Sequence, residues 1–370
     1  MKIALIGQKG IPVTHGGGVE KHVENLAVRL AELGHEVLVY TRRNYTDKRL
    51  KEYKGVRLIS LPSIPTKSLD AISHTLFACL DVIFRKVDVV HFHSIGPSSL
   101  LWLVKLFKRK TPVLATFHSQ CYYNEKWGWF AKSYLKLGEY MACRKADRVI
   151  TVSKSLSEYV SHKYPGAKVA YIPNGVNMPQ ILEPQEITTN WNLTKDNYIL
   201  SVGRLVRNKG LEYLIKAYQN LSTDKKLVIV GEGLLEAELK ELANNNPNIV
   251  FTGNQIGQTL EELFSNACLF VQPSESEGLS LALLEAMSYK NAVLVSDIPA
   301  NLEAVGENGL TFKSQNTDEL KNKLQELLND QNRLDNNKEE MYKKVVQDYN
   351  WHDLTDKLVQ LYEEVIKLKR

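Results

Sequence analysis

Short runs of valine, isoleucine and leucine alternate with segments of helical period along almost the whole chain. In the first half the strand-like runs lie at 2–7, 36–41, 56–61, 87–91, 113–117, 148–152 and 168–172. Helical periods fall between several of them, at 19–33, 70–85, 98–108, 130–144 and 154–163. Apolar strands separated by helices predict parallel βαβ units, in which helices cover both faces of one sheet.

The alternation pauses once and then resumes. Residues 172–176, with the sequence Ile-Pro-Asn-Gly-Val, have turn chemistry, and residues 179–191 show little periodicity. The later strands are expected at 198–202, 226–230, 249–251, 269–271 and 292–296, and the later helices at 210–221, 234–245, 259–266, 281–289 and beyond 317.

A chain of 370 residues is long enough for two domains. We therefore predict an α/β protein with two doubly wound, Rossmann-like domains, at 1–173 and 174–349, which face each other across a cleft. Residues 351–367 have an amphipathic helical period, so residues 350–370 are expected to form a separate closing helix.

The four cysteines are scattered, without CxxC spacing. This distribution argues against a zinc site and a disulfide framework, and it favours a reducing cytoplasm. No stretch reaches the roughly 18 uncharged apolar residues of a membrane span. The first apolar run meets Gly7 too soon for a signal peptide. We therefore expect a cytoplasmic protein.

The net charge of +5 hides an asymmetry between the two halves. Residues 1–175 carry 27 Lys and Arg against 13 Asp and Glu, whereas the remainder carries 20 against 29. A basic half suits nucleic acid, anionic lipid or a phosphorylated substrate, although solvated surface lysines give the same balance.

The first candidate motif follows the first strand. Ligands of open α/β sheets bind beyond the carboxyl ends of the strands. Gly16, Gly17 and Gly18 lie there, just before a helix, where backbone N–H groups can approach an anion. A flexible loop would have the same sequence. The dinucleotide fingerprint GxGxxG is absent, which disfavours an NAD site.

The second motif follows the strand at 198–202. Arg204 lies at the carboxyl end of this strand and Lys209 at the entry of the next helix. A planar guanidinium and a compact ammonium are a natural pair for a diphosphate. Arg207, between them, is interpreted as a solvated surface charge.

The most informative stretch follows the strand at 269–271. Glu277 precedes residues 278–280, whose backbone amides can face phosphate oxygens at a helix start. Glu285 lies eight residues later, about two helical turns, where it can hold a ribose. Two glutamates at this spacing also arise by chance, but an unpaired carboxylate buried among apolar neighbours would be costly.

A histidine closes the strand at 113–117. His118 would face the cleft there and could hydrogen-bond a substrate hydroxyl. His91 and His93, after another strand, compete for this role. A structural histidine with satisfied hydrogen bonds fits the pattern equally well.

Together these motifs resemble those of the retaining glycosyltransferases of family four, which have the GT-B fold. The resemblance runs over essentially the whole chain, and Glu277 and Glu285 meet the family's E-x7-E signature. The other matching positions are the glycines at 16–18, His118, residues 172–176, residues 203–210 and the Val-Gly-Glu-Gly turn at 230–233.

The resemblance implies transfer of a sugar from a nucleotide-diphosphate donor, a UDP- or GDP-sugar, to a glycan or lipid-linked glycan. It implies retention of anomeric configuration, with no metal, no other cofactor and no nucleic-acid partner. His118 and Glu277 would contact the transferred sugar, and the closing helix would return to the first domain. The donor-binding candidates are Gly17, Gly18, Arg204, Lys209, Gly278, Leu279, Ser280 and Glu285.

Three other functions remain open at this point. A sugar-nucleotide 2-epimerase would share the fold and the diphosphate site but would need no acceptor. A dehydrogenase is disfavoured by the missing fingerprint. A non-catalytic sugar-nucleotide sensor is disfavoured because both domains carry candidate site residues.

Basic and aromatic residues of the first domain suggest where an acceptor lies. Together they suit a membrane interface, so we expect docking on the cytoplasmic leaflet, although the aromatics could instead pack in the core or hold a soluble sugar. The basic residues are Arg42, Arg43, Lys48, Arg49, Lys51, Lys54, Lys105, Lys108, Arg109 and Lys110. The aromatic residues are Tyr122, Tyr123, Trp127, Trp129 and Phe130, interleaved with Lys126 and Lys132.

Overall fold

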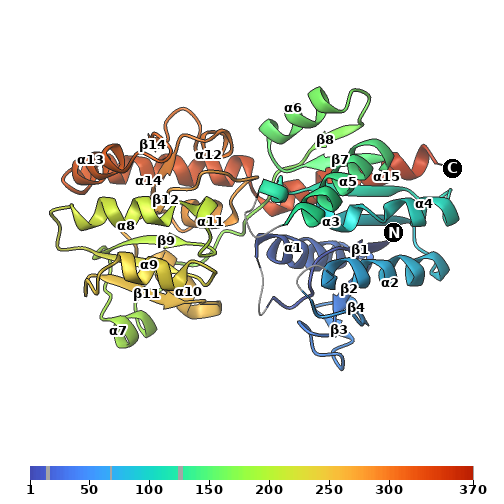
Figure 1. The fold of residues 1–370 in the computed structure, drawn as a ribbon, viewed down its shortest axis with the longest axis horizontal. Coiled ribbons are helices and arrows are strands. Elements are labelled where there is room, and N and C mark those ends of the chain that lie inside the picture. Colours follow the sequence, from blue (N-terminus) through green and yellow to red (C-terminus); the bar gives the residue numbers. More distant parts are fainter. Residues whose placement is uncertain (14–16, 67–68, 124–127, 370) are drawn as a thin grey trace. The chain divides into compact units, whose positions relative to one another are not determined.

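The computed structural model describes residues 1–13, 17–66, 69–123 and 128–369 (Figure 1). Its contacts divide the chain into two compact units. Unit 1 comprises Met1–Asn174 and Trp351–Arg370, and unit 2 comprises Gly175–Asn350. The boundaries expected from the sequence lie one residue away from these. Each unit is an α/β body built on its own sheet, which confirms the predicted fold class.

Unit 1 contains an eight-stranded sheet in the order β3-β4-β2-β1-β5-β6-β7-β8. The strands are β1 (Lys2–Ile6), β2 (Glu36–Arg42), β3 (Glu52–Tyr53), β4 (Val56–Leu61), β5 (Val89–His93), β6 (Val113–Phe117), β7 (Arg148–Thr151) and β8 (Val169–Tyr171). Neighbouring strands are parallel except β3 and β4, which pair antiparallel at the edge. The sequence analysis missed β3 because two residues carry no periodic signal.

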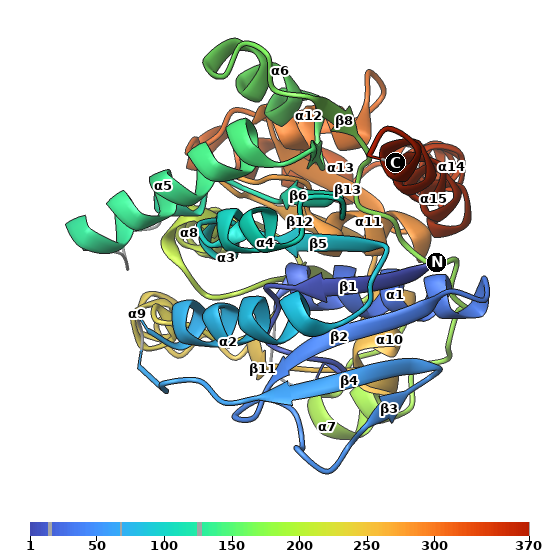
Figure 2. The same ribbon diagram turned by 90° about the vertical axis from the view of Figure 1, so that its right-hand side faces the viewer.

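Helices cover both faces of this sheet (Figure 2). They are α1 (Gly18–Glu32), α2 (Asp70–Phe84), α3 (Ile95–Ser98), α4 (Leu101–Phe107), α5 (Trp129–Lys145), α6 (Lys154–Lys163) and α15 (Trp351–Lys367), with a 3-10 turn at Cys121–Tyr123. Successive strand residues point to opposite faces. Ile3 and Leu5 therefore join the core with α1 and α15, while Ala4 and Ile6 join the core with α2 and α4.

The closing helix α15 packs on unit 1, as the resemblance implied. Trp351, Leu358 and Tyr362 are buried in the core shared with α1. The Tyr362 hydroxyl lies 2.7 Å from His91 Nδ1, and Arg148 forms an ion pair with Glu364 at 2.5 Å. The amphipathic period of residues 351–367 therefore reflects the burial of one face of α15 against the sheet of unit 1.

Unit 2 contains a six-stranded sheet in the order β11-β10-β9-β12-β13-β14, parallel throughout. The strands are β9 (Tyr198–Val202), β10 (Lys226–Val230), β11 (Ile249–Gly253), β12 (Leu269–Gln272), β13 (Ala292–Ser296) and β14 (Leu310–Phe312). The helices are α7 (Glu186–Trp191), α8 (Leu211–Gln219), α9 (Glu236–Leu242), α10 (Gly257–Ser265), α11 (Leu281–Ser288), α12 (Pro299–Val305), α13 (Thr317–Leu328) and α14 (Gln331–Asp348), with a 3-10 turn at Arg207–Lys209.

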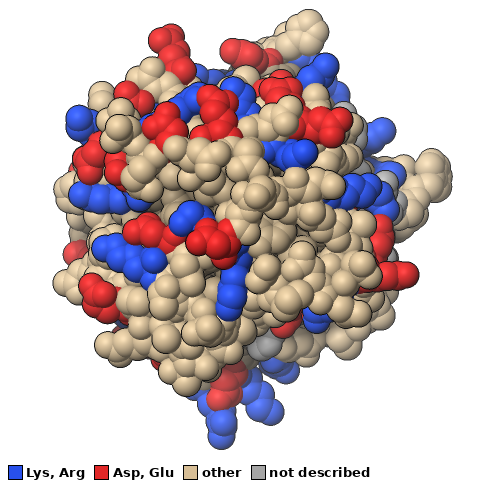
Figure 3. Space-filling view, turned by 90° about the vertical axis from the view of Figure 1, so that its left-hand side faces the viewer, with Lys and Arg blue, Asp and Glu red and all other residues tan. Residues whose placement is uncertain are grey.

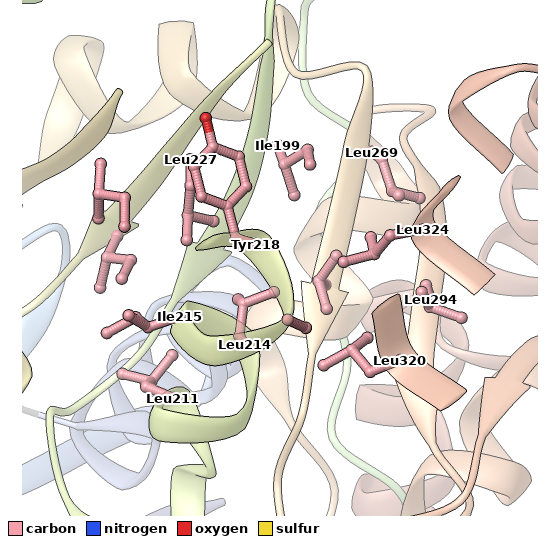
Figure 4. Packing of buried hydrophobic residues seen from close by; sticks show 14 of the residues in the cluster. Ile199, Leu211, Leu214, Ile215, Tyr218, Leu227, Leu269, Leu294, Leu320 and Leu324 are labelled. Carbon is pink, nitrogen blue, oxygen red and sulfur yellow. The ribbon is translucent and has the colours of Figure 1, made fainter. Parts of the chain in front are cut away.

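A leucine-rich core joins this sheet to its helices (Figure 4). Leu214 and Ile215 of α8 and Leu320 and Leu324 of α13 are fully buried against Leu269 of β12 and its neighbours. The sequence analysis missed α7 and β14, because six and three residues are too few to show a period. No helix among the described residues is long and apolar enough to cross a bilayer.

The contact between Tyr362 and His91 yields the first prediction. Both side chains are buried, and removal of the hydroxyl leaves a ring nitrogen of His91 without its partner. We expect Tyr362→Phe to lower the free energy of unfolding of unit 1 by about 1–3 kcal/mol, measured by urea denaturation. Tyr140→Phe, at a tyrosine that is 46% exposed, is the control, and an equal effect of both changes would contradict the assignment.

Candidate active site

The first group of predicted site residues lies where the strand order of unit 2 changes direction. From β9 the chain proceeds to β10 and β11 on one side, and then returns to add β12, β13 and β14 on the other. Open α/β sheets bind ligands at such a switch point, beyond the carboxyl ends of the strands. The loops after β9 and β12 carry Arg204, Lys209 and Glu277, so the two central sequence motifs meet at this edge.

Glycines allow the loops at this edge to touch backbone to backbone. A Cβ atom on Gly231, after β10, would lie 1.9 Å from the carbonyl oxygen of Gly203, after β9. A Cβ on Gly210 would lie 2.1 Å from the carbonyl oxygen of Pro273, after β12. Gly231 and Gly210 also have positive φ, which favours glycine. Three loops can therefore share one surface without intervening side chains.

The central feature of this surface is an ion pair between Lys209 Nζ and Glu277 Oε1. Both side chains are largely buried, with 17% and 12% of their area exposed. Ser274 Oγ donates a hydrogen bond of 2.7 Å to the same carboxylate oxygen. The structure thus pairs a cation predicted to bind a diphosphate with the carboxylate predicted to contact the sugar.

The two arginines of the loop after β9 have different surroundings. The Arg204 side chain is exposed beside the carboxyl end of β9. Arg207 is also exposed and lies 3.8 Å from Glu238, a carboxylate on α9. Arg204 therefore provides an accessible guanidinium on the same loop as Lys209.

A buried polar network that the sequence analysis missed supports the loop after β12. Gln272, at the end of this strand, accepts a hydrogen bond of 2.6 Å from Ser280 Oγ and donates one of 2.7 Å to Asn301. Asn301 donates to Ser296 Oγ, which donates to the backbone carbonyl of Ser274. Gln272 at the end of an otherwise apolar strand was the available signal, because a buried amide needs such partners.

The remaining residues of the acidic motif form the start of α11. Ser280 is the N-cap of this helix, and its Oγ lies 3.4 Å from the backbone N–H of Leu283. Gly278 and Leu279 are buried just before it. Glu285, on α11 itself, is half-buried.

The second group of predicted residues lies in unit 1, at the switch between β1 and β5. Gly18 is the first residue of α1, and Gly17 precedes it. The Gly17 N–H donates a hydrogen bond of 2.9 Å to the carboxylate of Glu20, which also accepts from the N–H of Lys9. This N–H group therefore already has an acidic partner. Gly16 lies outside the described residues.

His118, directly after β6, belongs to a cluster of four buried histidines on one face of the unit 1 sheet. His91 and His93 lie two residues apart on β5 and so share that face. His118 Nε2 is 3.3 Å from His93 Nδ1, and the ring of His22, on α1, is 4.8 Å from that of His118 between centroids. The sequence analysis did not select His22, because its position within a helix does not indicate that it packs against His93 and His118.

Burial keeps these imidazoles neutral at neutral pH. Desolvation lowers the pKa of His22 to about 4, with a side-chain hydrogen bond to Asn174 acting in the opposite direction. It also lowers the pKa of His118 and of His93 well below the usual value, and the neighbouring histidines add to this effect. His118 is 9% exposed, and as a neutral ring it can both donate and accept a hydrogen bond.

Two family models match consecutive parts of the chain. Residues 16–179 match the model described as "Glycosyltransferase Family 4", and residues 185–344 match "Glycosyl transferases group 1". An uncharacterised glycosyltransferase of Methanocaldococcus jannaschii is 28% identical, over 100% of this chain and 99% of its own length.

Solved structures share the fold at lower identity. Sucrose-phosphate synthase of Thermosynechococcus elongatus has a TM-score of 0.83 and 23% identity, over 99% of each chain. The HepE protein of Anabaena in complex with UDP-glucose has a TM-score of 0.81 and 17% identity, over 98% of this chain and 100% of its own. The chain belongs to the glycosyltransferases of the GT-B fold, with a family-4 first half and a group-1 second half.

Two glycines of unit 2 provide a test of the loop packing. Gly231→Ala combines a positive φ with a 1.9 Å approach to the Gly203 carbonyl oxygen, whereas Gly253→Ala has a positive φ but no atom within 4 Å. Backbone strain alone costs about 1–3 kcal/mol, so both changes should destabilise unit 2. We expect only Gly231→Ala to weaken nucleotide binding at least tenfold, measured by calorimetry on folded protein. Equal binding by the two variants would contradict this packing.

Proposed function

We propose that this glycosyltransferase is a retaining enzyme that uses a nucleotide-diphosphate sugar and needs no metal ion. The observation that carries the proposal is the Lys209–Glu277 pair at the switch point of unit 2, with Arg204 exposed on the same loop as Lys209. A diphosphate placed there would meet two cations and the start of α11. The UDP-glucose held by the Anabaena protein of similar fold supports a UDP-sugar, and a GDP-sugar remains the alternative.

In this proposal the donor rearranges the charges of the site. Lys209 exchanges its contact with Glu277, wholly or in part, for a phosphate oxygen, while Arg204 binds the diphosphate from the exposed side. Glu277 then becomes available to the hydroxyls of the transferred sugar, held by its hydrogen bond from Ser274. Glu285 binds the ribose from the next turns of α11.

Transfer breaks the bond between the anomeric carbon and the diphosphate. The leaving diphosphate gains negative charge, which Arg204 and Lys209 stabilise. The sugar becomes oxocarbenium-like, and a hydroxyl of the acceptor attacks from the face that the diphosphate leaves, so the anomeric configuration is retained. The proton of this hydroxyl passes to an oxygen of the departing diphosphate. His118 holds a sugar hydroxyl as a neutral imidazole.

The donor site predicts a contrast between cations of one loop. Arg204→Ala and Lys209→Ala should each weaken binding of a nucleoside diphosphate more than tenfold, since a hydrogen bond to a charged group contributes about 1.5–3 kcal/mol. Arg207→Ala, on the same loop, is the control and should bind normally. Calorimetry with the diphosphate and with the bare nucleoside measures both effects. Unchanged diphosphate affinity in Arg204→Ala and Lys209→Ala would remove the assignment.

The proposed role of Glu277 predicts a loss of rate rather than of binding. Glu277→Gln should lower kcat by a factor of about 100 or more, while nucleoside diphosphate binding stays equal or tightens because Lys209 loses its counter-charge. Glu275→Gln, two residues away, is the matched control. EDTA should leave the wild-type rate unchanged, and a rate that disappears with EDTA and returns with Mg²⁺ would refute metal independence.

We further propose that unit 1 docks on an anionic membrane surface and takes a lipid-linked or polymeric glycan as acceptor. Large apolar side chains project from three helices that pack side by side, α2, α4 and α5. Phe84 is 88% exposed, Phe107 63%, Trp129 82% and Phe130 66%. Figure 2 shows the first turns of α5 extending beyond its neighbours. Exposed apolar groups of this size mark an interaction surface.

The structure corrects the list of residues expected to make this contact. Arg42 is buried and paired with Asp70, and Tyr122 is buried with its hydroxyl 3.0 Å from that of Tyr159. Lys105 is paired with Asp147, and Lys108 donates to backbone carbonyl groups. Lys126 and Trp127 lie outside the described residues.

Exposed cations remain at the carboxyl ends of α2 and α4, close to Phe84 and Phe107. Trp129 and Phe130 lie at the start of α5, at the other end of this layer of helices. Lys86 follows α2, and Arg109 and Lys110 follow α4. The face drawn in Figure 3 differs, because its lysines and arginines are interspersed with acidic residues. In unit 2, Lys240 is paired with Glu236, and Arg333 is paired with Glu326.

Vesicle flotation tests the docking surface. The protein should bind vesicles that contain phosphatidylglycerol and should lose this binding in high salt, since each basic residue contributes about 1 kcal/mol near an anionic surface. It should not bind vesicles of pure phosphatidylcholine. The double change Trp129→Ser with Phe130→Ser should weaken binding at least tenfold. Leu234→Ser, at a leucine of unit 2 that is 74% exposed, is the control. Protein that stays soluble with anionic vesicles at low salt would contradict docking and leave the transferase assignment intact.

A further inference from the structure

The histidine cluster of unit 1 has more nitrogen atoms than its hydrogen bonds occupy. His91 is fully partnered, with Nδ1 at 2.7 Å from the Tyr362 hydroxyl and Nε2 at 2.7 Å from Thr116 Oγ1. The other three histidines differ. His22 Nδ1 and His93 Nε2 are buried without any hydrogen-bond partner. Buried polar atoms are rarely left in this state.

His22, His93 and His118 also have the geometry of a metal site. One nitrogen of each ring lies within 4.8 Å of one nitrogen of each other ring. Among the described residues, these three histidines are the group that could hold a metal ion. Zinc–nitrogen bonds of 2.0–2.1 Å in a tetrahedron place the nitrogen atoms about 3.4 Å apart. His93 Nδ1 and His118 Nε2 are 3.3 Å apart, which is close to this spacing. A zinc ion bound to these two atoms would replace the hydrogen bond between the two rings.

The chemical state of the three rings suits a transition metal. Metal ligands must be neutral imidazoles, and burial lowers the pKa of each ring so that the neutral form dominates at neutral pH. Nitrogen ligands favour zinc over magnesium or calcium, which prefer oxygen. Three histidines leave the fourth position of zinc open to water.

We propose that His22, His93 and His118 form a binding site for one zinc ion, and that zinc bound there inhibits glycosyl transfer. The inhibition rests on the proposed role of His118. Zinc would fix the orientation of this ring and occupy one of its two nitrogens, so that the ring could no longer both donate and accept a hydrogen bond. The ion is not a cofactor of the reaction, which proceeds without it. The spacing of residues along the sequence gives no sign of this site, because its three histidines come from α1, β5 and the loop after β6.

Binding is tested first, without any activity measurement. Full-length protein is stripped with EDTA, freed of chelator and titrated with Zn²⁺ by calorimetry near neutral pH. We expect one zinc per chain, and at least tenfold weaker binding for His22→Gln and for His93→Gln. His162→Gln, at an exposed histidine of α6, is the matched control and should bind like the wild type, while circular dichroism confirms that each variant is folded.

A spectroscopic measurement on the wild type guards against variants that fail to fold. Co²⁺ in place of zinc should give the intense visible absorption of a four-coordinate ion, without the thiolate charge-transfer band that cysteine ligands produce. Absence of one-to-one zinc binding, equal zinc affinity in the wild type and both variants, or a six-coordinate cobalt spectrum would each overturn the site.

The inhibitory consequence is tested separately. Zn²⁺ should suppress transfer by the wild type, EDTA should restore it, and Mg²⁺ at the same concentration should do neither. His22→Gln should need at least tenfold more zinc for the same fractional inhibition of its own rate. If zinc binds as expected and the rate does not change, inhibition is refuted and the zinc site stands. If no sugar nucleotide supports transfer, the proposed function fails, and the binding result alone decides the site.

Discussion

Burial of both faces of a parallel sheet is the constraint on which the rest of each unit depends. Because helices cover the two faces, polar side chains are excluded from most of the strand length, and chemistry is confined to the loops at the strand ends. In unit 2 those loops meet beside β9 and β12, where the strand order reverses. Gly231 and Gly210 then remove the side chains that would hold the loops apart.

Polar groups within this constraint are held by partners from distant parts of the sequence. Glu277 is largely buried, and it is kept there by Lys209 and Ser274. The hydrogen bond between Gln272 and Asn301 connects the end of β12 with α12, and it thereby fixes the start of the loop that carries Glu277. A phosphate that takes Lys209 from Glu277 gives the lysine a new charge partner, while Glu277 keeps its hydrogen bond from Ser274.

The same constraint explains the histidines of unit 1. Side chains two residues apart on β5 must share one face of the sheet, so His91 and His93 lie together under α1 and α15. His91 has two hydroxyl partners there, whereas His93 contacts other imidazoles. Burial suppresses protonation, and a cluster of neutral rings with unpartnered nitrogens results.

The sequence by itself determined the fold class, most strands and helices, and the loops that carry Arg204, Lys209 and Glu277. These features are local: period, turn chemistry and the position of a motif after a strand can all be read along the chain. Elements without such a signal, such as β3, α7 and β14, could not be predicted, because two to six residues contain too little pattern.

Only the tertiary structure decided which of these residues have partners. It paired Lys209 with Glu277, buried Arg42 against Asp70, exposed Trp129 and brought His22 to His93 and His118. Each of these outcomes joins side chains far apart in the sequence or depends on which helix covers a face. Such contacts arise from packing in three dimensions, and spacing along one chain carries no record of them.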